Sequence, residues 1–154
     1  MIFMERRALD LERDYPSLLE MHRLSWQINF PGRLFSEATF RSSLQTAPQD
    51  QIFIYEIASE VVGWLWLDKV RPGECHIRHI QVARDYWGKG LGRQIMEDAI
   101  RMCQENGSSA LTLNVTKSNE RAVNLYTHLG FAVTEDRGER QGMRLVLREK
   151  ASER

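Results

Sequence analysis

Hydrophobic and polar positions along this 154-residue chain follow two periods, one typical of β-strands and one typical of amphipathic helices. Runs rich in β-branched and aromatic residues predict seven strands, at residues 3–8, 51–58, 61–70, 75–83, 111–115, 131–134 and 143–147. Apolar residues at helical spacing predict four helices, at about residues 14–28, 36–47, 91–106 and 119–129. The predicted order of elements is therefore β α α β β β α β α β β.

Residues with special backbone preferences mark the ends of these elements. Asp14 can cap the first helix, with Pro16 in its first turn, and Ser36 can cap the second. Ser59–Glu60 predicts a tight turn between two strands, and the polar segment 136–142 predicts a longer turn between the last two. These signals divide the chain without leaving a low-complexity linker or an internal repeat.

The order of the elements predicts the fold class. Strand–helix–strand crossovers in the second half of the chain imply parallel pairing there, whereas the hairpins imply antiparallel pairing elsewhere. We therefore expect an α/β fold with one mixed central sheet of about seven strands, flanked by about four helices. A chain of 154 residues fits one domain, so we expect residues 1–154 to form a single domain.

Composition narrows the classes of function. The chain has 21 basic and 21 acidic side chains and a formal net charge of zero, which disfavours general binding to nucleic acid. Its two cysteines, Cys75 and Cys103, form neither a disulfide framework nor a metal-ligand pattern, so we expect no metal and a reducing, cytoplasmic setting. No apolar run approaches the roughly 20 residues of a membrane span, and the start becomes charged too early for a signal peptide.

The sequence Trp-Gly-Lys-Gly-Leu-Gly at residues 87–92 connects a predicted strand to a predicted helix. Closely spaced glycines in such a turn expose main-chain N–H groups at the positive end of the helix, where a phosphate or pyrophosphate binds. Lys89, with Arg84 before the motif and Arg93 after it, would add positive charge, although a solvated surface explains such residues equally well. A tight turn without a ligand is the simpler alternative for the glycines.

A second motif follows later in the chain. Its spacing is Asn-x-x-Ala-x-x-x-Tyr-x-x-x-Gly-Phe, and its members are Asn119, Ala122, Tyr126, Gly130 and Phe131. Together with the glycine-rich loop, and in the same order, it resembles the GNAT N-acetyltransferases over residues 77–147. The resemblance implies a GNAT fold and the transfer of an acetyl group from acetyl-CoA to an amine in a ternary complex, without a metal. One position departs from the family pattern, since Trp87 stands where relatives usually have Gln or Arg.

The resemblance also implies which residues bind the coenzyme. The strand containing Ile80, Gln81 and Val82 is expected to part from the strand at 111–115, so that its main chain binds the pantetheine arm. A main-chain N–H near Val82 would polarise the thioester carbonyl, while the side chains of Ile80 and Val82 fit core packing. Asn119 is expected to reach the same arm as well as to cap its helix. The pyrophosphate is expected at the loop residues Trp87, Gly88, Lys89, Gly90, Leu91, Gly92 and Arg93, among which Trp87 also fits core packing.

Tyr126 is the residue that the resemblance implies as general acid. Its phenol, with an ordinary pKa of about 10, would protonate the departing coenzyme thiolate, and a packing role on an amphipathic helix is the alternative. The base that removes a proton from the amine is less determined. His76 is our candidate, and its odd spacing from His79 places the two on opposite faces of a regular strand. Glu74, Asp85 or a chain of water molecules would also serve.

Two other classes of protein could use such a loop. A non-catalytic module that binds or senses acyl-CoA would need the fold and the loop, but it would not need the hydroxyl of Tyr126. A P-loop protein or a dinucleotide-binding protein is disfavoured, because the chain contains neither Gly-x-x-x-x-Gly-Lys-Ser/Thr nor Gly-x-Gly-x-x-Gly.

The amine acceptor is left open by these motifs. By the resemblance, the segments 26–44 and 136–143 shape the acceptor pocket, and a small-molecule amine or a peptide amine would be compatible with them. The aromatic candidates to line it, unless they are core residues, are Trp26, Phe30, Phe35 and Trp64. We expect no nucleic-acid or membrane partner, and an exposed last strand would allow pairing with a second copy of the chain.

Overall fold

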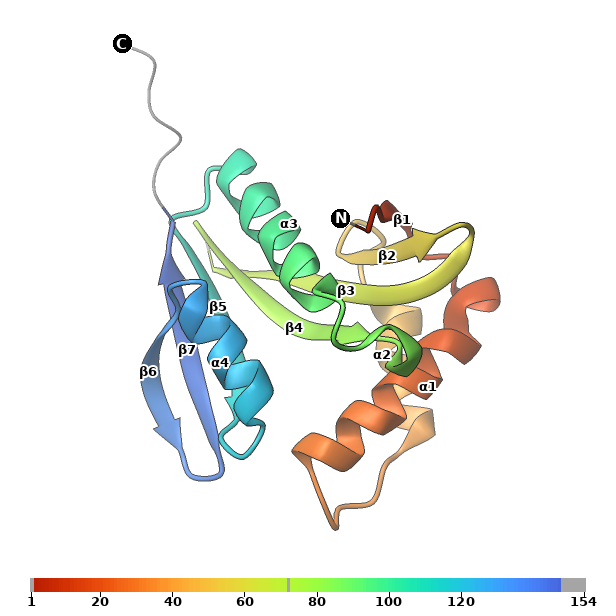
Figure 1. The fold of residues 1–154 in the computed structure, drawn as a ribbon, viewed down its shortest axis with the longest axis horizontal. Coiled ribbons are helices and arrows are strands. Elements are labelled where there is room, and N and C mark those ends of the chain that lie inside the picture. Colours follow the sequence, from red (N-terminus) through yellow and green to blue (C-terminus); the bar gives the residue numbers. More distant parts are fainter. Residues whose placement is uncertain (1, 72, 148–154) are drawn as a thin grey trace. The chain divides into compact units, whose positions relative to one another are not determined.

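The computed structural model describes residues 2–71 and 73–147, and its elements follow the predicted order (Figure 1). The strands are β1 (Glu5–Ala8), β2 (Ile52–Ile57), β3 (Glu60–Arg71), β4 (Glu74–Val82), β5 (Ala110–Thr116), β6 (Ala132–Arg137) and β7 (Arg140–Val146). The α-helices are α1 (Leu11–Asn29), α2 (Glu37–Thr46), α3 (Leu91–Glu105) and α4 (Glu120–His128). A short 3-10 helix, η1 (Arg84–Tyr86), lies between β4 and α3.

The strands form one mixed sheet in the order β1-β2-β3-β4-β5-β7-β6. Antiparallel pairs join β1 to β2, β2 to β3, β5 to β7 and β6 to β7, whereas β4 and β5 are parallel. The parallel pairing joins Glu74–Ile77 to Ala110–Leu113. Within the described part of the chain it ends there, although β4 continues to Val82 and β5 to Thr116. The predicted mixed sheet of seven strands is confirmed, and so is the early parting of its two parallel strands.

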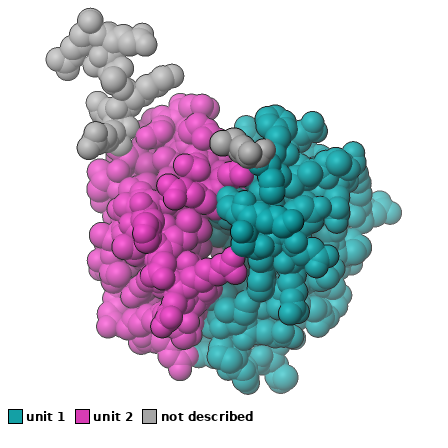
Figure 2. Space-filling model, in the orientation of Figure 1, with its two compact units in different colours: residues 1–66, 79–92 teal, residues 67–78, 93–154 magenta. Residues whose placement is uncertain are grey.

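The chain divides into two compact units (Figure 2). One comprises residues 1–66 and 79–92, and the other comprises residues 67–78 and 93–154. In the first unit, α1 and α2 bury apolar side chains together with β2 and β3. The buried cluster contains Tyr15, Leu18, Met21, Phe40, Leu44, Ile52, Ile54, Trp64 and Trp66. Each such side chain contributes roughly 1.5–3 kcal/mol through removal from water, which is what holds these two helices in place.

The second unit has a core of its own. In this unit α3 buries Ile95, Ala99 and Cys103, and β5 buries Leu111, Leu113 and Val115. The rings of Tyr126 and Phe131 lie 6.0 Å apart at the end of α4. The remaining buried residues from α3 and β7 include Met96 and Met143. Among the described residues, none of the helices has both the length and the apolar composition that a transmembrane span requires.

The start of α1 differs from the sequence prediction. Asp10 is the N-cap, and its side chain accepts a hydrogen bond from the Arg13 N–H. Asp14 is instead fully buried, where its carboxylate accepts two 2.7 Å hydrogen bonds from the Arg7 guanidinium and a 2.9 Å bond from the Asp10 N–H. Pro16 therefore lies inside the helix and not in its first turn. The prediction was wrong because Asp14 pairs with a cation from β1, which no local pattern indicates.

Two turns also differ from their predicted positions. The β2–β3 turn is made by Ala58 and Ser59, whose φ angles are 49° and 68°, one residue earlier than predicted. The long polar turn predicted at 136–142 is instead a short connection through Gly138, whose φ is 78°. Its polar residues belong to β6 and β7. Every residue of β6 is exposed at the edge of the sheet, and the strand extends three residues beyond the predicted range 131–134 into the polar segment.

Candidate functional site

The glycine-rich loop has the backbone that its sequence predicts. Gly88 and Gly90 have φ angles of 78° and 80°, in the left-handed region that glycine alone enters without strain. A Cβ at Gly90 would meet no atom within 4 Å, so open space faces this main chain. The helix α3 begins directly afterwards at the fully buried Leu91. The loop therefore presents main-chain groups to open space at the positive end of a 15-residue helix.

Trp87 is tied to the end of β4 and does not belong to the core. Its side chain is 38% exposed, and its indole N–H donates a 2.8 Å hydrogen bond to the Val82 carbonyl oxygen. The expectation of core packing for this residue is wrong. The motif could not indicate this contact, because the pattern usually has Gln or Arg at this position and so says nothing about an indole N–H. The bond fixes the first residue of the glycine-rich loop against the last residue of β4.

The basic residues around the loop lie at the surface. Lys89 Nζ is 5.7 Å from the centre of the Tyr86 ring, and the Tyr86 hydroxyl donates a 2.9 Å hydrogen bond to Glu60. Arg93 Nε is 3.9 Å from a carboxylate oxygen of Glu97, one turn further along α3. Both members of that ion pair are about half exposed, so it holds the arginine only weakly.

The main chain at the end of β4 has an orientation that its hydrogen bonds define. The Ala83 N–H donates a 2.8 Å bond to the Val62 carbonyl oxygen of β3. Because main-chain groups alternate in direction along an extended chain, the N–H and the C=O of Val82 point to the opposite edge of β4. The bond from Trp87 reaches the Val82 carbonyl at that edge. The side chains of Ile80 and Val82 are half-buried.

The Gln81 side chain, in contrast, is buried and belongs to a polar network. Its Oε1 accepts a 2.7 Å hydrogen bond from the indole N–H of Trp64, and its Nε2 lies 2.9 Å from Nδ1 of His22. The His22 ring stacks on Phe40 at 4.1 Å between ring centres, with 5° between the planes. Burial lowers the pKa of His22 to about 4, so its imidazole is neutral at pH 7. No pattern in the sequence indicated this link between His22 and Gln81.

The two histidines of β4 have different surroundings, as their spacing predicted. His79 belongs to the first unit and lies among aromatic rings, 5.3 Å from Trp64 and 4.9 Å from His22 between ring centres. Trp64 is fully buried, so it is a core residue and no part of an open acceptor pocket. Trp26 is half-buried, and its ring centre lies 4.5 Å from that of Phe30.

His76 belongs to the second unit and is half-buried on β4. Its Nδ1 lies 2.7 Å from the Thr112 hydroxyl oxygen, and that hydroxyl donates a 3.4 Å hydrogen bond to the Cys75 carbonyl. With its proton directed to the carbonyl, the Thr112 oxygen accepts from Nδ1–H, which leaves the lone pair of the ring on Nε2. Burial lowers the pKa of His76 below its ordinary value and outweighs the opposing effect of Asp68.

Tyr126 and Asn119 lie at opposite ends of α4. The Tyr126 side chain is 9% exposed, and burial raises the pKa of its phenol to about 12. Among the described residues, none forms a hydrogen bond with the Tyr126 hydroxyl. Asn119 is the N-cap of the helix, and its side chain accepts a 3.3 Å hydrogen bond from the Ala122 N–H, as predicted. Tyr126, Asn119, His76 and Arg93 all belong to the second unit, whereas residues 79–92 belong to the first.

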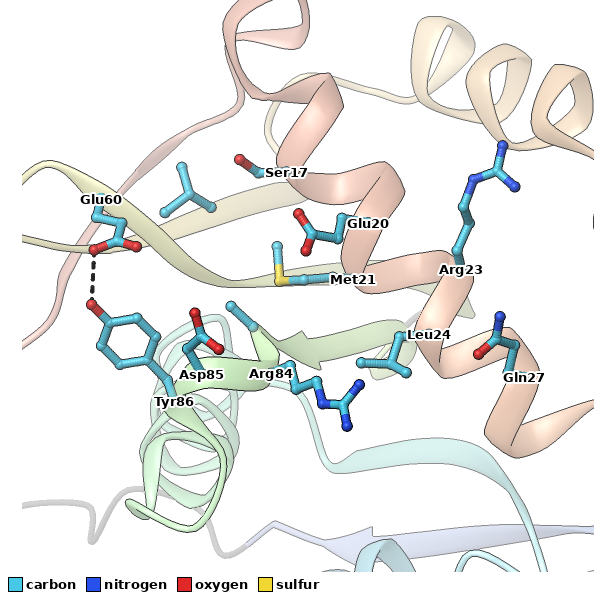
Figure 3. Close-up of a pocket in the computed structure, with 12 residues that line it drawn as sticks. Ser17, Glu20, Met21, Arg23, Leu24, Gln27, Glu60, Arg84, Asp85 and Tyr86 are labelled. Atoms are coloured by element: carbon cyan, nitrogen blue, oxygen red, sulfur yellow. Dashed lines mark hydrogen bonds between the residues drawn. The ribbon is translucent and has the colours of Figure 1, made fainter.

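A pocket of about 450 Å³ lies within the first unit, between α1 and the segment that contains η1 (Figure 3). Met21, Leu24 and Val61 are among its apolar residues. Figure 3 shows the carboxylates of Glu20, Glu60 and Asp85 around it, with Glu60 bonded to the Tyr86 hydroxyl. Asp85, one of the bases considered from the sequence, therefore lines a surface pocket beside α1. No group of three or more potential metal-binding side chains occurs in residues 2–71 and 73–147.

Known proteins are similar to this chain in both sequence and fold. A family model described as the acetyltransferase (GNAT) family matches residues 15–131. An uncharacterized N-acetyltransferase of Bacillus subtilis, YdgE, is 35% identical over 85 residues, which are 53% of this chain and 54% of that protein. The aligned region thus spans about half the length of this relative.

Two solved structures give the corresponding result for the fold. Ard1 from Thermoplasma volcanium superposes with a TM-score of 0.77 at 20% identity, covering 95% of this chain and 99% of that one. The PaiA N-acetyltransferase from Thermoplasma acidophilum, solved in complex with coenzyme A, superposes with a TM-score of 0.72 at 20% identity, covering 94% and 99%. The family model covers most of the chain and the fold agrees with it, so this protein belongs to the acetyltransferase (GNAT) family.

Proposed function

We propose that this protein is an acetyl-CoA-dependent N-acetyltransferase that acetylates a primary amine of a small molecule or a peptide. The observation that carries the proposal is the loop at the start of α3, where Gly88 and Gly90 both adopt positive φ and open space faces the main chain of Gly90. Membership of the GNAT family supports acetyl-CoA as the ligand of this loop. YdgE carries the name of an N-acetyltransferase, and PaiA was solved with coenzyme A.

The proposed binding groups for the coenzyme are main-chain groups and a few polar or basic side chains. Main-chain N–H groups of residues 87–92 bind the pyrophosphate, and the exposed Lys89 and Arg93 add positive charge. The main chain of Ile80, Gln81 and Val82 pairs with the pantetheine arm, as an added strand would. The remaining proposed contact comes from Asn119, whose side chain also caps α4.

The chemistry is a direct transfer without a covalent enzyme intermediate. The neutral amine attacks the thioester carbonyl, and the Val82 N–H stabilises the negative charge that develops on its oxygen. The C–S bond then breaks, the sulfur leaves as a thiolate, and Tyr126 transfers its phenolic proton to that sulfur. A phenol with a pKa of about 12 is fully protonated at pH 7, and it has no hydrogen-bond partner among the described residues that would compete for this proton.

His76 is the proposed base for the amine. A pKa below the ordinary value keeps its imidazole neutral at pH 7, as a proton acceptor must be. The lone pair on Nε2 is then available to accept the proton. Thr112 holds the opposite nitrogen, so the ring has one fixed orientation. The amine proton goes to His76 and then to solvent, and Tyr126 recovers a proton from solvent after each turnover.

The test uses the full chain, acetyl-CoA and a panel of amines, with release of the free thiol as the readout. Peptides, lysine, polyamines, arylalkylamines and aminoglycosides are the amine classes to include. We expect thiol release with at least one class and a strong decrease for Tyr126→Phe, with coenzyme binding kept. If wild type and Tyr126→Phe bind acetyl-CoA with equal affinity and neither acetylates any amine, the protein is a sensing module. The absence of any binding heat with coenzyme A or acetyl-CoA contradicts the whole proposal.

The cellular setting and the oligomeric state are part of the proposal as well. Both cysteines are buried and unbridged, which suits a reducing, cytoplasmic setting. The expectation that the last strand is free to pair is wrong, because β7 lies between β5 and β6 in the sheet. The edge strand is β6, all of whose residues are exposed, and pairing of this edge with a second copy would give a homodimer. Size-exclusion chromatography with light scattering tests the second point.

A further inference from the structure

The Gln81 side chain occupies an unusual place for a polar group. It lies between Ile80 and Val82, whose main chain is the proposed binding surface for the thioester, but it points into the core of the first unit. Gln81 is 8% exposed and Trp64, its partner on β3, is fully buried. His22, its partner on α1, is 8% exposed. One amide thus joins three elements through two buried hydrogen bonds.

The chemistry of the three partners fixes the orientation of this amide. An indole N–H can only donate, so the atom of Gln81 that faces Trp64 is the carbonyl oxygen. The atom that faces His22 is then the amide nitrogen, which can only donate. His22 Nδ1 must accept that hydrogen bond. The neutral His22 ring therefore carries its proton on Nε2, and protonation of Nδ1 would set two donors against each other.

This arrangement is directional in a way that ordinary core packing is not. Reversal of the amide would face Trp64 with a second donor, and loss of either partner would leave a buried polar group without a hydrogen bond. The two bonds thus hold the Cα of Gln81, and with it the neighbouring main chain, in one position. A shift of about 1 Å in groups that contact a reacting bond can reduce a rate about a hundredfold.

We propose that Gln81 is a positioning residue, which acts through His22 and Trp64 to hold the Ile80–Val82 main chain in the geometry that binds and polarises the thioester. The inference rests on the proposed function, since it assigns an origin to the rigidity of that same site. His22 acts through its Nδ1 acceptor and not through proton transfer to the substrate.

The first experiment measures the ring nitrogens of His22 by ¹⁵N NMR in the full chain at pH 7. We expect Nδ1 to have the chemical shift of an unprotonated nitrogen and Nε2 that of a protonated one. In Gln81→Leu we expect the two tautomers to exchange, because the amide donor is missing. A wild-type ring protonated on Nδ1 would overturn the inferred hydrogen-bond network and with it the proposal.

The second experiment compares two substitutions of His22 that separate hydrogen bonding from packing. His22→Asn keeps an acceptor oxygen near the position of Nδ1 and loses the ring, whereas His22→Phe keeps a ring to stack on Phe40 and loses the acceptor. We expect kcat of His22→Asn to stay within about threefold of wild type and kcat of His22→Phe to fall about tenfold or more. KM for acetyl-CoA should change less than kcat, because the glycine-rich loop is intact in both.

Each outcome separates this inference from the proposed function. If His22→Phe keeps the wild-type kcat, or if the two variants rank in the opposite order, Gln81 has no positioning role. Thermal unfolding of both variants controls for loss of folded protein. A wild-type chain that binds acetyl-CoA but acetylates no amine contradicts the proposed function alone. In that case a lower affinity for acetyl-CoA in His22→Phe than in His22→Asn supports the positioning role of Gln81, and equal affinities contradict it.

Discussion

The indole N–H of Trp87 donates a 2.8 Å hydrogen bond to the carbonyl oxygen of Val82, and so joins the glycine-rich loop to the end of β4. The Val82 carbonyl and the Val82 N–H lie at the same edge of the strand. The tryptophan therefore holds the loop beside the main-chain group that we assign to the thioester. This relationship connects the two proposed coenzyme contacts of the first unit, the pyrophosphate loop and the strand end.

The first prediction concerns this bond. Trp87→Phe keeps an aromatic ring but loses the N–H, and one net hydrogen bond contributes about 0.5–1.5 kcal/mol. We expect the affinity for acetyl-CoA to fall about threefold to tenfold, since the loop then has a looser connection to Val82. Isothermal titration calorimetry measures the effect. Leu34→Ala is the control, because Leu34 is 96% exposed and belongs to neither the loop nor β4. Equal affinities of Trp87→Phe and wild type would show that the bond does not order the loop.

The second prediction uses a matched pair of glycines. Gly90 and Gly107 have φ angles of 80° and 75°, and a Cβ at either would meet no atom within 4 Å. Alanine at each position therefore costs about 1–2 kcal/mol of backbone strain and creates no clash. Only Gly90 lies in the glycine-rich loop, whereas Gly107 follows the C-terminus of α3.

We expect both alanine variants to lose similar stability, but only Gly90→Ala to lose affinity for coenzyme A. The expected loss is about tenfold, because relief of the strain turns loop N–H groups away from the pyrophosphate. Chemical unfolding and calorimetry on the same samples give the two quantities. A similar decrease of affinity in Gly107→Ala would assign the effect to general destabilisation and would remove the support for a pyrophosphate loop.

The sequence predicted the elements more completely than their side-chain contacts. Strands β2 to β5 and helix α3 were predictable because they bury apolar side chains, and burial leaves an apolar run or a regular period in the sequence. Only the first half of β6 was predicted, since all residues of this strand are exposed and residues 135–137 are polar without hydrophobic alternation. The loop at Gly88 and Gly90 was recognisable from glycine spacing alone, because its geometry depends on the main chain.

Contacts between distant segments escaped prediction. Asp14 has the residue type of a helix cap, and only its pairing with Arg7 on β1 explains why it is buried inside α1. Gln81 has the residue type of a surface position, and only His22 and Trp64 explain its burial. Periodicity describes which face of an element is apolar, whereas these polar contacts depend on residues 7 to 59 positions away.

The third prediction concerns the buried ion pair of the first unit. Arg7 contacts both Asp14, which is fully buried, and Glu56, and it thereby joins β1 to α1 and β2. Asp14→Asn leaves the partly buried guanidinium with one carboxylate, and we expect a loss of about 2–4 kcal/mol in the free energy of unfolding. Glu97→Gln removes half of an exposed ion pair in α3 and should cost less than about 1 kcal/mol. Urea unfolding measures both, and equal losses would contradict a special role for Asp14.

The same carboxylate predicts a dependence of stability on acid. Burial alone would raise the pKa of Asp14, but hydrogen bonds from Arg7 and the Asp10 N–H, with the charge of Arg7, lower it below its ordinary value. Stability from this group is therefore complete above the unfolded pKa of about 3.9, and it is lost as pH falls through the lower pKa of the folded state. Asp14→Asn should flatten the stability profile in this acid range, as unfolding at a series of pH values will measure.

The last prediction concerns His22 at a higher pH range. Its pKa is about 4 in the folded chain against an ordinary value of 6.5, because the ring is buried. The amide N–H of Gln81 faces Nδ1, and a protonated Nδ1 would set a second donor against it. An oxygen of Gln81 at that place would raise the pKa, but this oxygen accepts from Trp64. Between pH 6.5 and 4 the unfolded chain binds a proton at His22 that the folded chain does not.

Stability should therefore fall as pH decreases from 6.5, by about 3 kcal/mol in total from this residue, and this loss should end near pH 4. His22→Phe has no imidazole at this position. Between pH 6.5 and 4 its free energy of unfolding should therefore fall by about 3 kcal/mol less than that of wild type. His76 has a lowered pKa in both proteins, and its contribution cancels in the comparison. Urea unfolding at pH 7, 5.5 and 4 tests this, and parallel profiles would mean that His22 titrates normally and is not held neutral by the core and Gln81.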